Sequence, residues 1–423
     1  MSGVLRVATA GSVDDGKSTL IGRLLHDSKN IYADQLDAIA VASRRKGYDE
    51  TDLALLTDGL RAEREQGITI DVAYRYFATP ARSFILADTP GHVQYTRNMV
   101  TGASTAQVAI VLVDARKGLL DQSRRHAAIA ALLRVRHLVL AVNKLDLVDF
   151  SEAVFDEIAA DFAEVARRCD APDWTAMPIS ALRGDNVVTR SAATPWYAGP
   201  PLLQLLEELE PAPAAADIGA RLPVQLVIRP RTVTHPDYRG YAGRVEAGTL
   251  RVGDPVRVFP SGQHSSVTGI DTQAGELTQA SSGRSVVVRL ADDLDVSRGD
   301  VLVTGETPPT VTNELVGTVC WLREQPLRPG GRFRLRHTTR DTTAVVESVV
   351  NRLDVSTMSV TPTEHLTAGD IGRITVRTAQ QLVVDSYHDN RSTGAFLLTD
   401  EVSGGTVAAG MVEGPHGWIP SPA

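Results

Sequence analysis

A glycine-rich loop near the N-terminus constrains the fold of this 423-residue chain more than any other stretch. Residues 11–18 read GSVDDGKS and match the pattern G-x-x-x-x-G-K-[ST]. The apolar residues 4–10 before the loop predict a buried strand, and the helical spacing of residues 18–25 predicts a helix after it. Strand, loop and helix in this order place backbone N–H groups and a helix N-terminus around phosphate oxygens.

The loop also supplies side chains for a nucleoside triphosphate and its magnesium ion. Lys17 is predicted to reach the β- and γ-phosphates, and the Ser18 hydroxyl to ligate Mg²⁺. The predicted phosphate-binding residues are Gly11, Ser12, Val13, Asp14, Asp15, Gly16, Lys17, Ser18 and Thr19.

The composition of the whole chain limits the remaining possibilities. A chain of this length predicts two to four domains, and a net charge of −8 argues against a large nucleic-acid surface. The two cysteines, Cys169 and Cys320, fit neither a disulfide framework nor a zinc spacing, and predict reduced buried thiols. No signal peptide or run of eighteen apolar residues is present, so the sequence predicts a cytoplasmic protein without a membrane span.

Residues 1–212 alternate apolar strands with helical stretches, which predicts a doubly wound α/β domain with a mostly parallel sheet. Strands are predicted at residues 72–77, 83–88, 108–114, 137–143 and 176–179, and helices at 123–133 and 152–168. The polar segment 27–69 is long for a connection and predicts a mobile, functional insertion. Ligands of such domains bind at the carboxyl ends of the strands.

The first strand-end motif is Asp-Thr-Pro-Gly, at residues 88–91. The Asp88 carboxylate is predicted to hold the Mg²⁺ shell through water. The Gly91 backbone N–H is predicted to approach a γ-phosphate, because glycine has no side chain to block it.

Two further strand-end motifs point to a guanine base. Residues 143–146 fit N-K-x-D, in which Asp146 would accept hydrogen bonds from guanine N1–H and the 2-amino group, a donor pair that adenine lacks. Lys144 would pack along the base, and Asn143 would support the loop. A backbone N–H for guanine O6 is expected from the segment Ser180, Ala181 and Leu182. The four motifs, in this order and each at a strand end, predict a GTP site.

In the second half of the chain, the sequence pattern changes from helical spacing to short strands that alternate with glycine-containing turns. A Pro/Ala linker at residues 210–217 marks a boundary, and residues 243–258, 285–290 and 297–302 predict a small closed β-barrel. A second break at 306–310 precedes further strands, such as 315–321 and 371–376. The predicted domains are 1–212 (phosphate-loop domain), 218–308 and 312–413 (two β-barrels), with a flexible tail at 414–423.

These motifs resemble the GTPases of the translation-factor class, which includes elongation factor Tu. Residues 64–70 resemble the first switch of that class, and its Mg²⁺- and γ-phosphate-sensing threonine matches Thr69. His92 matches the histidine that orients the attacking water. The resemblance therefore implies His92, Lys17 and Thr69 as catalytic residues, and Ser18, Thr69 and Asp88 at the metal.

A closer resemblance covers nearly the whole chain. Asp15, where elongation factors carry histidine, and residues 57–77 and 94–104 are similar to the GTPase subunit of bacterial sulfate adenylyltransferase. Val93 departs from many relatives, which carry glutamate, but this position need not touch nucleotide. The implied cofactors are GTP and Mg²⁺.

The resemblance also implies a separate catalytic partner. The sequence contains neither a second phosphate loop nor the Ser-Gly-Gly-x-Asp-Ser pyrophosphate loop of the ATP-using subunit. The chain would hydrolyse GTP and couple it to the strongly uphill formation of adenosine 5′-phosphosulfate and pyrophosphate from ATP and sulfate by that partner. No nucleic-acid or membrane partner is implied.

Two alternatives stay open at this level. One is a translation factor that delivers aminoacyl-tRNA, and the other is a standalone GTP-binding switch. Asp15, the match at residues 61–77 and the acidic balance favour the sulfate-activating subunit over the translation factor.

Overall fold

The structure is a computed structural model that describes residues 4–28, 71–92, 95–169, 171, 173–210, 218–230, 237–354 and 359–414. The chain divides into two compact units, one of residues 1–212 with 354–359 and one of residues 213–353 with 360–423. The predicted insertion at 27–69, from residue 29 onward, and the predicted tail, from residue 415 onward, lie outside the described residues.

The first unit is built on a six-stranded sheet in the order β2-β3-β1-β4-β5-β6. The five strands from β3 to β6 are parallel, and β2 pairs with β3 in the antiparallel sense. The strands are β1 (Leu5–Gly11), β2 (Ala73–Ala78), β3 (Ser83–Asp88), β4 (Val108–Asp114), β5 (His137–Asn143) and β6 (Asp173–Pro178). The predicted mostly parallel α/β sheet is confirmed.

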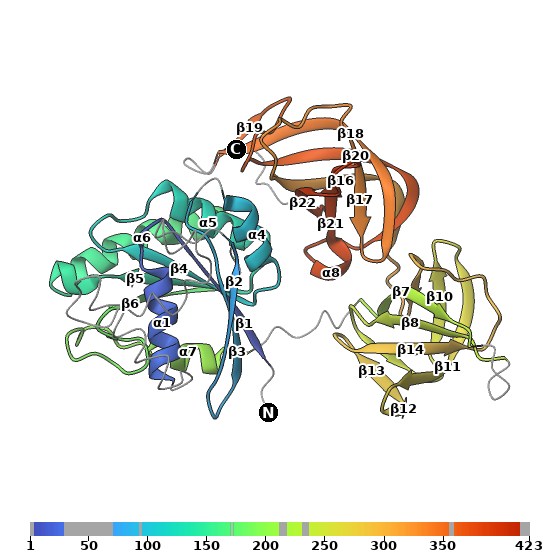
Figure 1. Cartoon of the computed structure of the whole chain (residues 1–423), viewed down its shortest axis with the longest axis horizontal. Coiled ribbons are helices and arrows are strands. Elements are labelled where there is room, and N and C mark those ends of the chain that lie inside the picture. The colour runs from blue at the N-terminus through green and yellow to red at the C-terminus, as the bar shows by residue number, and fades with distance from the viewer. Residues whose placement is uncertain are drawn as a thin grey trace. The chain divides into compact units, whose positions relative to one another are not determined.

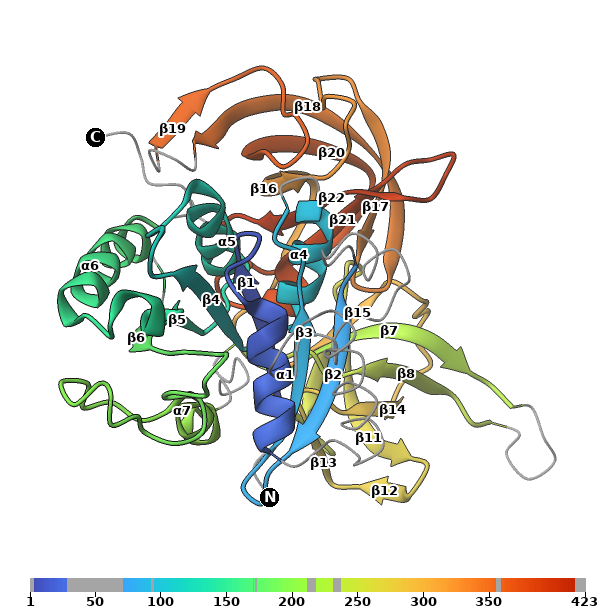
Figure 2. The same ribbon diagram turned by 60° about the vertical axis from the view of Figure 1, so that its left-hand side comes forward.

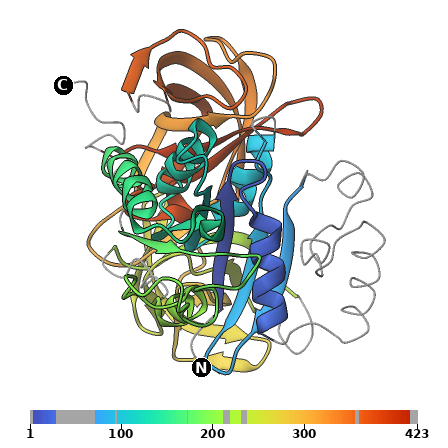
Figure 3. The ribbon, with the colours of Figure 1, turned by 90° about the vertical axis from the view of Figure 1, so that its left-hand side faces the viewer.

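Helices cover this sheet. They are α1 (Lys17–Asp27), α4 (Thr96–Ser104), α5 (Asp121–Leu132), α6 (Glu152–Arg168) and α7 (Leu202–Glu208), with a short 3-10 turn η3 (Leu145–Val148). Helix α1 contacts β1 and β3, and Figures 2 and 3 show it alongside the sheet. Its buried side chains share one apolar core with those of α7. Helix α5 packs between α4 and α6.

Local sequence explains these elements. All seven residues of β4 are buried, as expected for a central strand covered on both faces. In α6, Ser151 caps the N-terminus by accepting from Val154 N at 3.4 Å, and Arg167 and Arg168 occupy the last turn. Its buried residues Phe155, Ile158, Phe162, Val165 and Ala166 follow helical spacing.

The second unit contains two barrels, shown in green to yellow and in orange to red in Figure 1. The first barrel closes through the pairing β10–β11 in the ring β10-β15-β7-β8-β14-β11. Its strands are β7 (Arg221–Ile228), β8 (Gly240–Arg244), β10 (Pro255–Phe259), β11 (Gln263–Thr272), β14 (Ser285–Leu290) and β15 (Val301–Val303), with the short strands β9 (Thr249–Arg251), β12 (Gly275–Leu277) and β13 (Gln279–Ser281).

The second barrel closes through β17–β18 in the ring β17-β21-β22-β16-β20-β18. Its elements are β16 (Thr310–Trp321), β17 (Arg332–His337), β18 (Arg340–Asp354), β19 (Ser359–Pro362), β20 (Ile371–Val384), α8 (Arg391–Gly394), β21 (Ala395–Thr399) and β22 (Thr406–Val412). Fully buried Arg221 of β7 pairs with Asp385, which follows β20, so the two barrels share a buried ion pair. The prediction of an α/β domain followed by two all-β barrels is confirmed.

Some predicted ranges were wrong. β6 begins at Asp173 rather than at residue 176, because it is an edge strand whose first residues are exposed or only partly buried and interrupt the apolar pattern with Asp173 and Thr175. Residues 297–300 form a turn before β15, since the Asp300 carboxylate accepts from Ser297 N at 2.8 Å. Helices α4 and α7 were not predicted.

Both cysteines are buried and neither is part of a disulfide bond, as the sequence predicts, and burial raises the pKa of the Cys169 thiol to about 12. Within the described ranges, no helix combines the length and apolar character needed to cross a membrane.

Candidate nucleotide-binding site

The glycine-rich loop connects the last residue of β1, Gly11, to the first residue of α1, Lys17. Three loop residues have positive φ: Gly11 at 137°, Asp14 at 66° and Gly16 at 93°. A Cβ on Gly11 would lie 2.5 Å from the Leu112 carbonyl oxygen, so this position requires glycine. The loop is therefore bent against the end of β4.

Lys17 is the buried cation of the loop, with 7% of its surface exposed. Its Nζ donates to the carbonyl oxygens of Gly11 at 3.2 Å and of Ser12 at 2.7 Å. Burial lowers the pKa of Lys17, against the opposing charges of Asp15 and Asp88. A Cβ on Gly91 would lie 2.6 Å from this Nζ, which places the predicted γ-phosphate-facing glycine directly beside the lysine.

Asp15, which stands where the resemblance to elongation factors would place a histidine, points back into the loop. Its Oδ2 accepts from the Ser12 N–H at 2.6 Å, and the side chain is buried. Burial raises the pKa of Asp15, while the Ser12 hydrogen bond and Lys17 oppose that shift. Asp14 is exposed, and Val13 and Thr19 are half-buried.

The two predicted metal residues in the described part of the chain come together. The Ser18 hydroxyl donates to Asp88 Oδ2 at 3.4 Å, and Asp88 is 1% exposed at the end of β3. Thr9 donates to Asp88 Oδ1 at 3.3 Å and fixes the carboxylate from the β1 side. Thr69 lies outside the described residues.

His92 follows Gly91 on the surface of the first unit. Its side chain is exposed, and its ring packs edge-on against Tyr95 with the ring centroids 6.3 Å apart. The position directly after Gly91 is the one that the sequence predicts for a water-orienting group.

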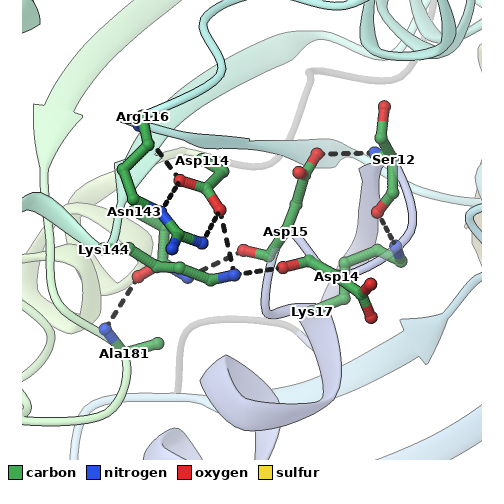
Figure 4. A network of polar contacts seen from close by, with 9 residues as sticks. All are labelled: Ser12, Asp14, Asp15, Lys17, Asp114, Arg116, Asn143, Lys144 and Ala181. Carbon is green, nitrogen blue, oxygen red and sulfur yellow. Dashed lines mark hydrogen bonds and ion pairs between the residues drawn. The ribbon is translucent and has the colours of Figure 1, made fainter. Parts of the chain in front are cut away.

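Asn143, at the end of β5, joins the loops (Figure 4). Its Nδ2 donates to the Asp15 carbonyl at 2.8 Å, and its Oδ1 accepts from Ala181 N at 2.9 Å. One buried amide thus connects the glycine-rich loop to the segment at 180–182. The sequence predicts that Asn143 supports the loop, and these two hydrogen bonds are the contacts through which it would do so.

The segment at 180–182 is held by α1 as well. Arg23 donates from Nε to the Ala181 carbonyl at 3.2 Å and from Nη2 to the Leu182 carbonyl. The Ser180 N–H donates to the Asp185 carbonyl at 3.2 Å. Of the three backbone N–H groups of this segment, that of Leu182 has no acceptor within the described ranges.

Asp146 lies close by, with 5% of its side chain exposed and its Oδ2 3.5 Å from Arg183 Nε. The carboxylate predicted to hydrogen-bond the base therefore has a cationic neighbour directly after the segment at 180–182, the segment that would face guanine O6. Sequence reasoning missed both Arg183 and Arg23.

Sequence reasoning also missed Asp114, the last residue of β4. Lys144 Nζ donates to Asp114 Oδ2 at 3.0 Å and to the Asp14 carbonyl at 2.5 Å (Figure 4). Arg116 binds the same carboxylate through two side-chain nitrogens. Asp114 ends a central parallel strand just as Asp88 does, so the strand-end rule applied to Asp88 would have found it.

Helix α5 supports the glycine-rich loop from a third direction. The Gly11 N–H donates to His126 Nδ1 at 3.0 Å, and the hydroxyls of Ser12 and Ser123 lie 3.1 Å apart. Burial, together with the charges of Lys17 and Arg125, lowers the pKa of the fully buried His126 to about 3. The imidazole is therefore neutral and accepts from the loop. No motif in the sequence marks this contact.

The first unit thus gathers a buried ammonium, a Ser–Asp oxygen pair and a carboxylate at one edge of its sheet. Fixed cations and N–H groups in this arrangement suit phosphoryl groups, and oxygen donors suit Mg²⁺.

Comparison with known families agrees with this geometry. Residues 2–212 match the family model described as elongation factor Tu GTP binding domain. Residues 314–413 match the model described as GTP-eEF1A C-terminal domain-like.

Three curated proteins illustrate the similarity over nearly the whole chain. The bifunctional enzyme CysN/CysC of Mycobacterium tuberculosis (strain H37Rv) is 55% identical over 414 residues, which cover 97% of this chain and 67% of that protein. Sulfate adenylyltransferase subunit 1 of Tolumonas auensis is 48% identical, covering 97% of this chain and 86% of that protein. The protein of the same name from Aeromonas salmonicida is 49% identical with the same coverage.

Proposed function

This chain belongs to the sulfate adenylyltransferase subunit 1 family and itself matches the elongation factor Tu GTP binding domain, and we propose that it couples GTP hydrolysis to sulfate activation. The reaction served is the formation of adenosine 5′-phosphosulfate and pyrophosphate from ATP and sulfate. A separate, pyrophosphate-loop subunit would carry out that reaction in the cytoplasm, and this chain would contribute GTP turnover.

The observation that carries the GTP site is the pair of hydrogen bonds made by Asn143. They hold the glycine-rich loop, the N-K-x-D loop and the segment at 180–182 together. In this arrangement Asp146 accepts from guanine N1–H and the 2-amino group, and the Leu182 N–H remains for O6. The phosphates then lie on the loop at 11–18 and at the N-terminus of α1.

The residues present fit a magnesium ion. Mg²⁺ in phosphate-loop enzymes is held by few protein oxygens together with the phosphates. The Ser18 hydroxyl and the buried Asp88 carboxylate, 3.4 Å apart, form such an oxygen pair, and Thr69 is the proposed third contributor. When bound, the ion would neutralise charge on the β- and γ-phosphate oxygens.

The protein's own groups would then act on the transferring phosphoryl group. Lys17 exchanges its loop carbonyls for phosphate oxygens, and the Gly91 N–H binds the γ-phosphate. His92 orients the attacking water from its exposed position after Gly91. No arginine in the matched motifs is placed to neutralise charge on the transferring phosphoryl group, so turnover by the chain alone is expected to be slow.

Reconstitution with the catalytic subunit tests the coupling. GTP hydrolysis and pyrophosphate release would be measured for the chain alone, the partner alone and the complex, each with and without ATP and sulfate. We expect hydrolysis to rise only in the complex with both substrates, and pyrophosphate release to require hydrolysable GTP. A rate of GTP hydrolysis that does not change with the partner, together with protection of aminoacyl-tRNA from hydrolysis by this chain, would instead identify a translation factor.

The base site has its own test in Asp146→Asn. The asparagine replaces an acceptor with a donor, which opposes guanine but matches the second carbonyl of xanthine. Hydrogen bonds to a charged group contribute about 1.5–3 kcal/mol, so GTP affinity should fall roughly tenfold to a hundredfold while XTP affinity rises. A variant that retains the wild-type preference for GTP would remove Asp146 from the base site.

The division into domains at 1–212, 218–308, 312–413 and 414–423 is part of the same proposal. Two closed barrels after a phosphate-loop domain, with β16 beginning at Thr310, support it.

A further inference from the structure

Asp114 is a fully buried carboxylate that belongs to none of the nucleotide motifs. Four donors reach it: Arg116 N at 3.0 Å and Arg116 Nε at 3.0 Å on Oδ1, and Arg116 Nη2 at 2.7 Å and Lys144 Nζ at 3.0 Å on Oδ2. An isolated buried charge is costly, whereas a carboxylate with this many donors is stable in its ionised form. Burial would raise the pKa of Asp114, but the hydrogen bonds from Arg116 and Lys144 outweigh burial and hold it well below its usual range.

Lys144 has its second partner in the glycine-rich loop. Its backbone is left-handed, with φ at 61°, and its ammonium donates to the Asp14 carbonyl as well as to Asp114. Three segments therefore meet at one ammonium: the end of β4, the glycine-rich loop and the N-K-x-D loop (Figure 4). The Lys144 side chain is a quarter exposed, so its stem remains accessible to a base.

We propose that Asp114 is a positioning residue of the guanine site, which holds the Lys144 ammonium against the Asp14 carbonyl and so orders the lysine stem along the base. The inference rests on the proposed GTP site. Arg116 orients the carboxylate through a two-pronged contact and leaves one of its oxygens shared with Lys144. Asp114 acts through Lys144 and touches no nucleotide itself.

The expected consequence is slower loss of nucleotide in the wild-type protein. Asp114→Asn keeps the shape of the side chain but removes its charge, so Lys144 loses a charge-assisted partner. Release of GDP should accelerate roughly tenfold to a hundredfold, the change expected when a hydrogen bond to a charged group is lost. GTP release should change by a similar factor, because the contact is made to the base side of the site.

A double-mutant cycle tests whether Asp114 acts through Lys144. Release of a fluorescent GDP would be measured for wild type, Asp114→Asn, Lys144→Met and the double variant. We expect the double variant to release GDP no faster than Lys144→Met alone, since the group that Asp114 positions is already absent. Full additivity of the two effects, or unchanged release in Asp114→Asn, would overturn the proposal.

A second variant serves if Asp114→Asn does not fold. Arg116→Gln removes the side chain that orients the carboxylate but leaves its charge with Lys144. It should accelerate release by a smaller factor, and this effect should vanish in the Lys144→Met background. An equal effect in both backgrounds counts against the positioning role.

The matched control is Asp385→Asn in the second unit. The Asp385 side chain is also buried, with 9% of it exposed, and accepts from Arg221 Nε at 3.2 Å and Nη2 at 3.2 Å. GDP release by this variant should stay at the wild-type rate. A change as large as that of Asp114→Asn would show that the effect is one of general stability and would sink the proposal.

Asp146→Asn separates failure of this inference from failure of the GTP site. If Asp146→Asn gains a preference for xanthine while the effects of Asp114→Asn and Lys144→Met on GDP release are additive, the base site stands and only the positioning role of Asp114 is ruled out. A variant that keeps guanine preference removes the base site, and the positioning role falls with it.

Discussion

The Asn143 side chain donates a 2.8 Å hydrogen bond to the carbonyl oxygen of Asp15, a residue 128 positions earlier in the chain. The same amide accepts from Ala181 N, so its loss would leave two backbone groups without partners. A buried polar group left unpaired costs about 1–3 kcal/mol. One uncharged side chain therefore contributes to the order of the nucleotide site, beside the charged contacts made by Arg23 and Lys144.

Asn143→Ala should consequently release GDP at least about tenfold faster and lower the free energy of unfolding by roughly 1–3 kcal/mol. Stopped-flow release and urea unfolding measure the two effects. Asn390→Ala is the control, because Asn390 is also buried and caps α8 in the second unit. Asn390→Ala should lower the free energy of unfolding without changing the rate of GDP release. Equal rates of GDP release in Asn143→Ala and Asn390→Ala would contradict the role of Asn143.

Gly91→Ala should impair nucleotide binding without a backbone penalty. Its Cβ would lie 2.6 Å from Lys17 Nζ and 2.9 Å from the Ser12 carbonyl carbon, so the lysine or the loop must shift. Overpacking of this kind costs about 1–3 kcal/mol, and GTP affinity should fall about tenfold or more. Calorimetric titration with GTP measures it. Gly405→Ala, which meets only the Ser403 hydroxyl at 3.4 Å, should bind as wild type does.

His92→Ala should slow GTP hydrolysis at least about tenfold and leave GTP affinity nearly unchanged. A group that orients water acts in the transition state, so its loss appears in kcat. Single-turnover hydrolysis and equilibrium binding separate the two quantities. His388→Ala removes another exposed histidine in the second unit and should hydrolyse GTP normally. An unchanged rate in His92→Ala would leave His92 as a surface residue.

His126 should make the stability of the protein depend on pH. The pKa of His126 is about 3 in the folded protein against an ordinary 6.5, so below pH 6.5 the unfolded chain takes up a proton that the folded chain does not. The contribution of His126 is thus present above pH 6.5 and is lost progressively as the pH falls toward 3. The slope approaches about 1.4 kcal/mol per pH unit for one proton.

His126→Gln removes the group that takes up a proton on unfolding, so the free energy of unfolding of this variant should depend less steeply on pH. Urea unfolding at pH 7, 6 and 5 would compare the two proteins, since His137 and His337 titrate in both. Parallel pH profiles for wild type and variant would show that His126 is not held neutral by the fold.

The motifs and the fold could be predicted from the sequence because each rests on short-range patterns. Residues 83–88, 108–114 and 137–143 are apolar runs that coincide with the strands β3, β4 and β5. The phosphate loop was found because it directly follows an apolar run, and Asp88 and Asn143 were found because each is the last residue of one.

The contacts that support the site could not be found this way. Arg23 lies within α1, and His126 and Ser123 lie within α5, so each reaches a loop distant in the sequence only after the sheet has formed. Arg183 and Arg116 are exposed cations on turns, which no pattern distinguishes from other surface arginines. Asp114 is the exception, because it stands at a strand end.

Lys17 already makes two hydrogen bonds to carbonyl oxygens of its own loop. Most of the dehydration of its ammonium therefore takes place when the chain folds. An incoming triphosphate replaces neutral dipoles with charged oxygens around a cation that has little water left to lose. When the triphosphate binds, the attraction between its charged oxygens and the Lys17 ammonium is therefore only weakly offset by loss of water from the ammonium. The larger cost of dehydration on binding is that of the nucleotide itself.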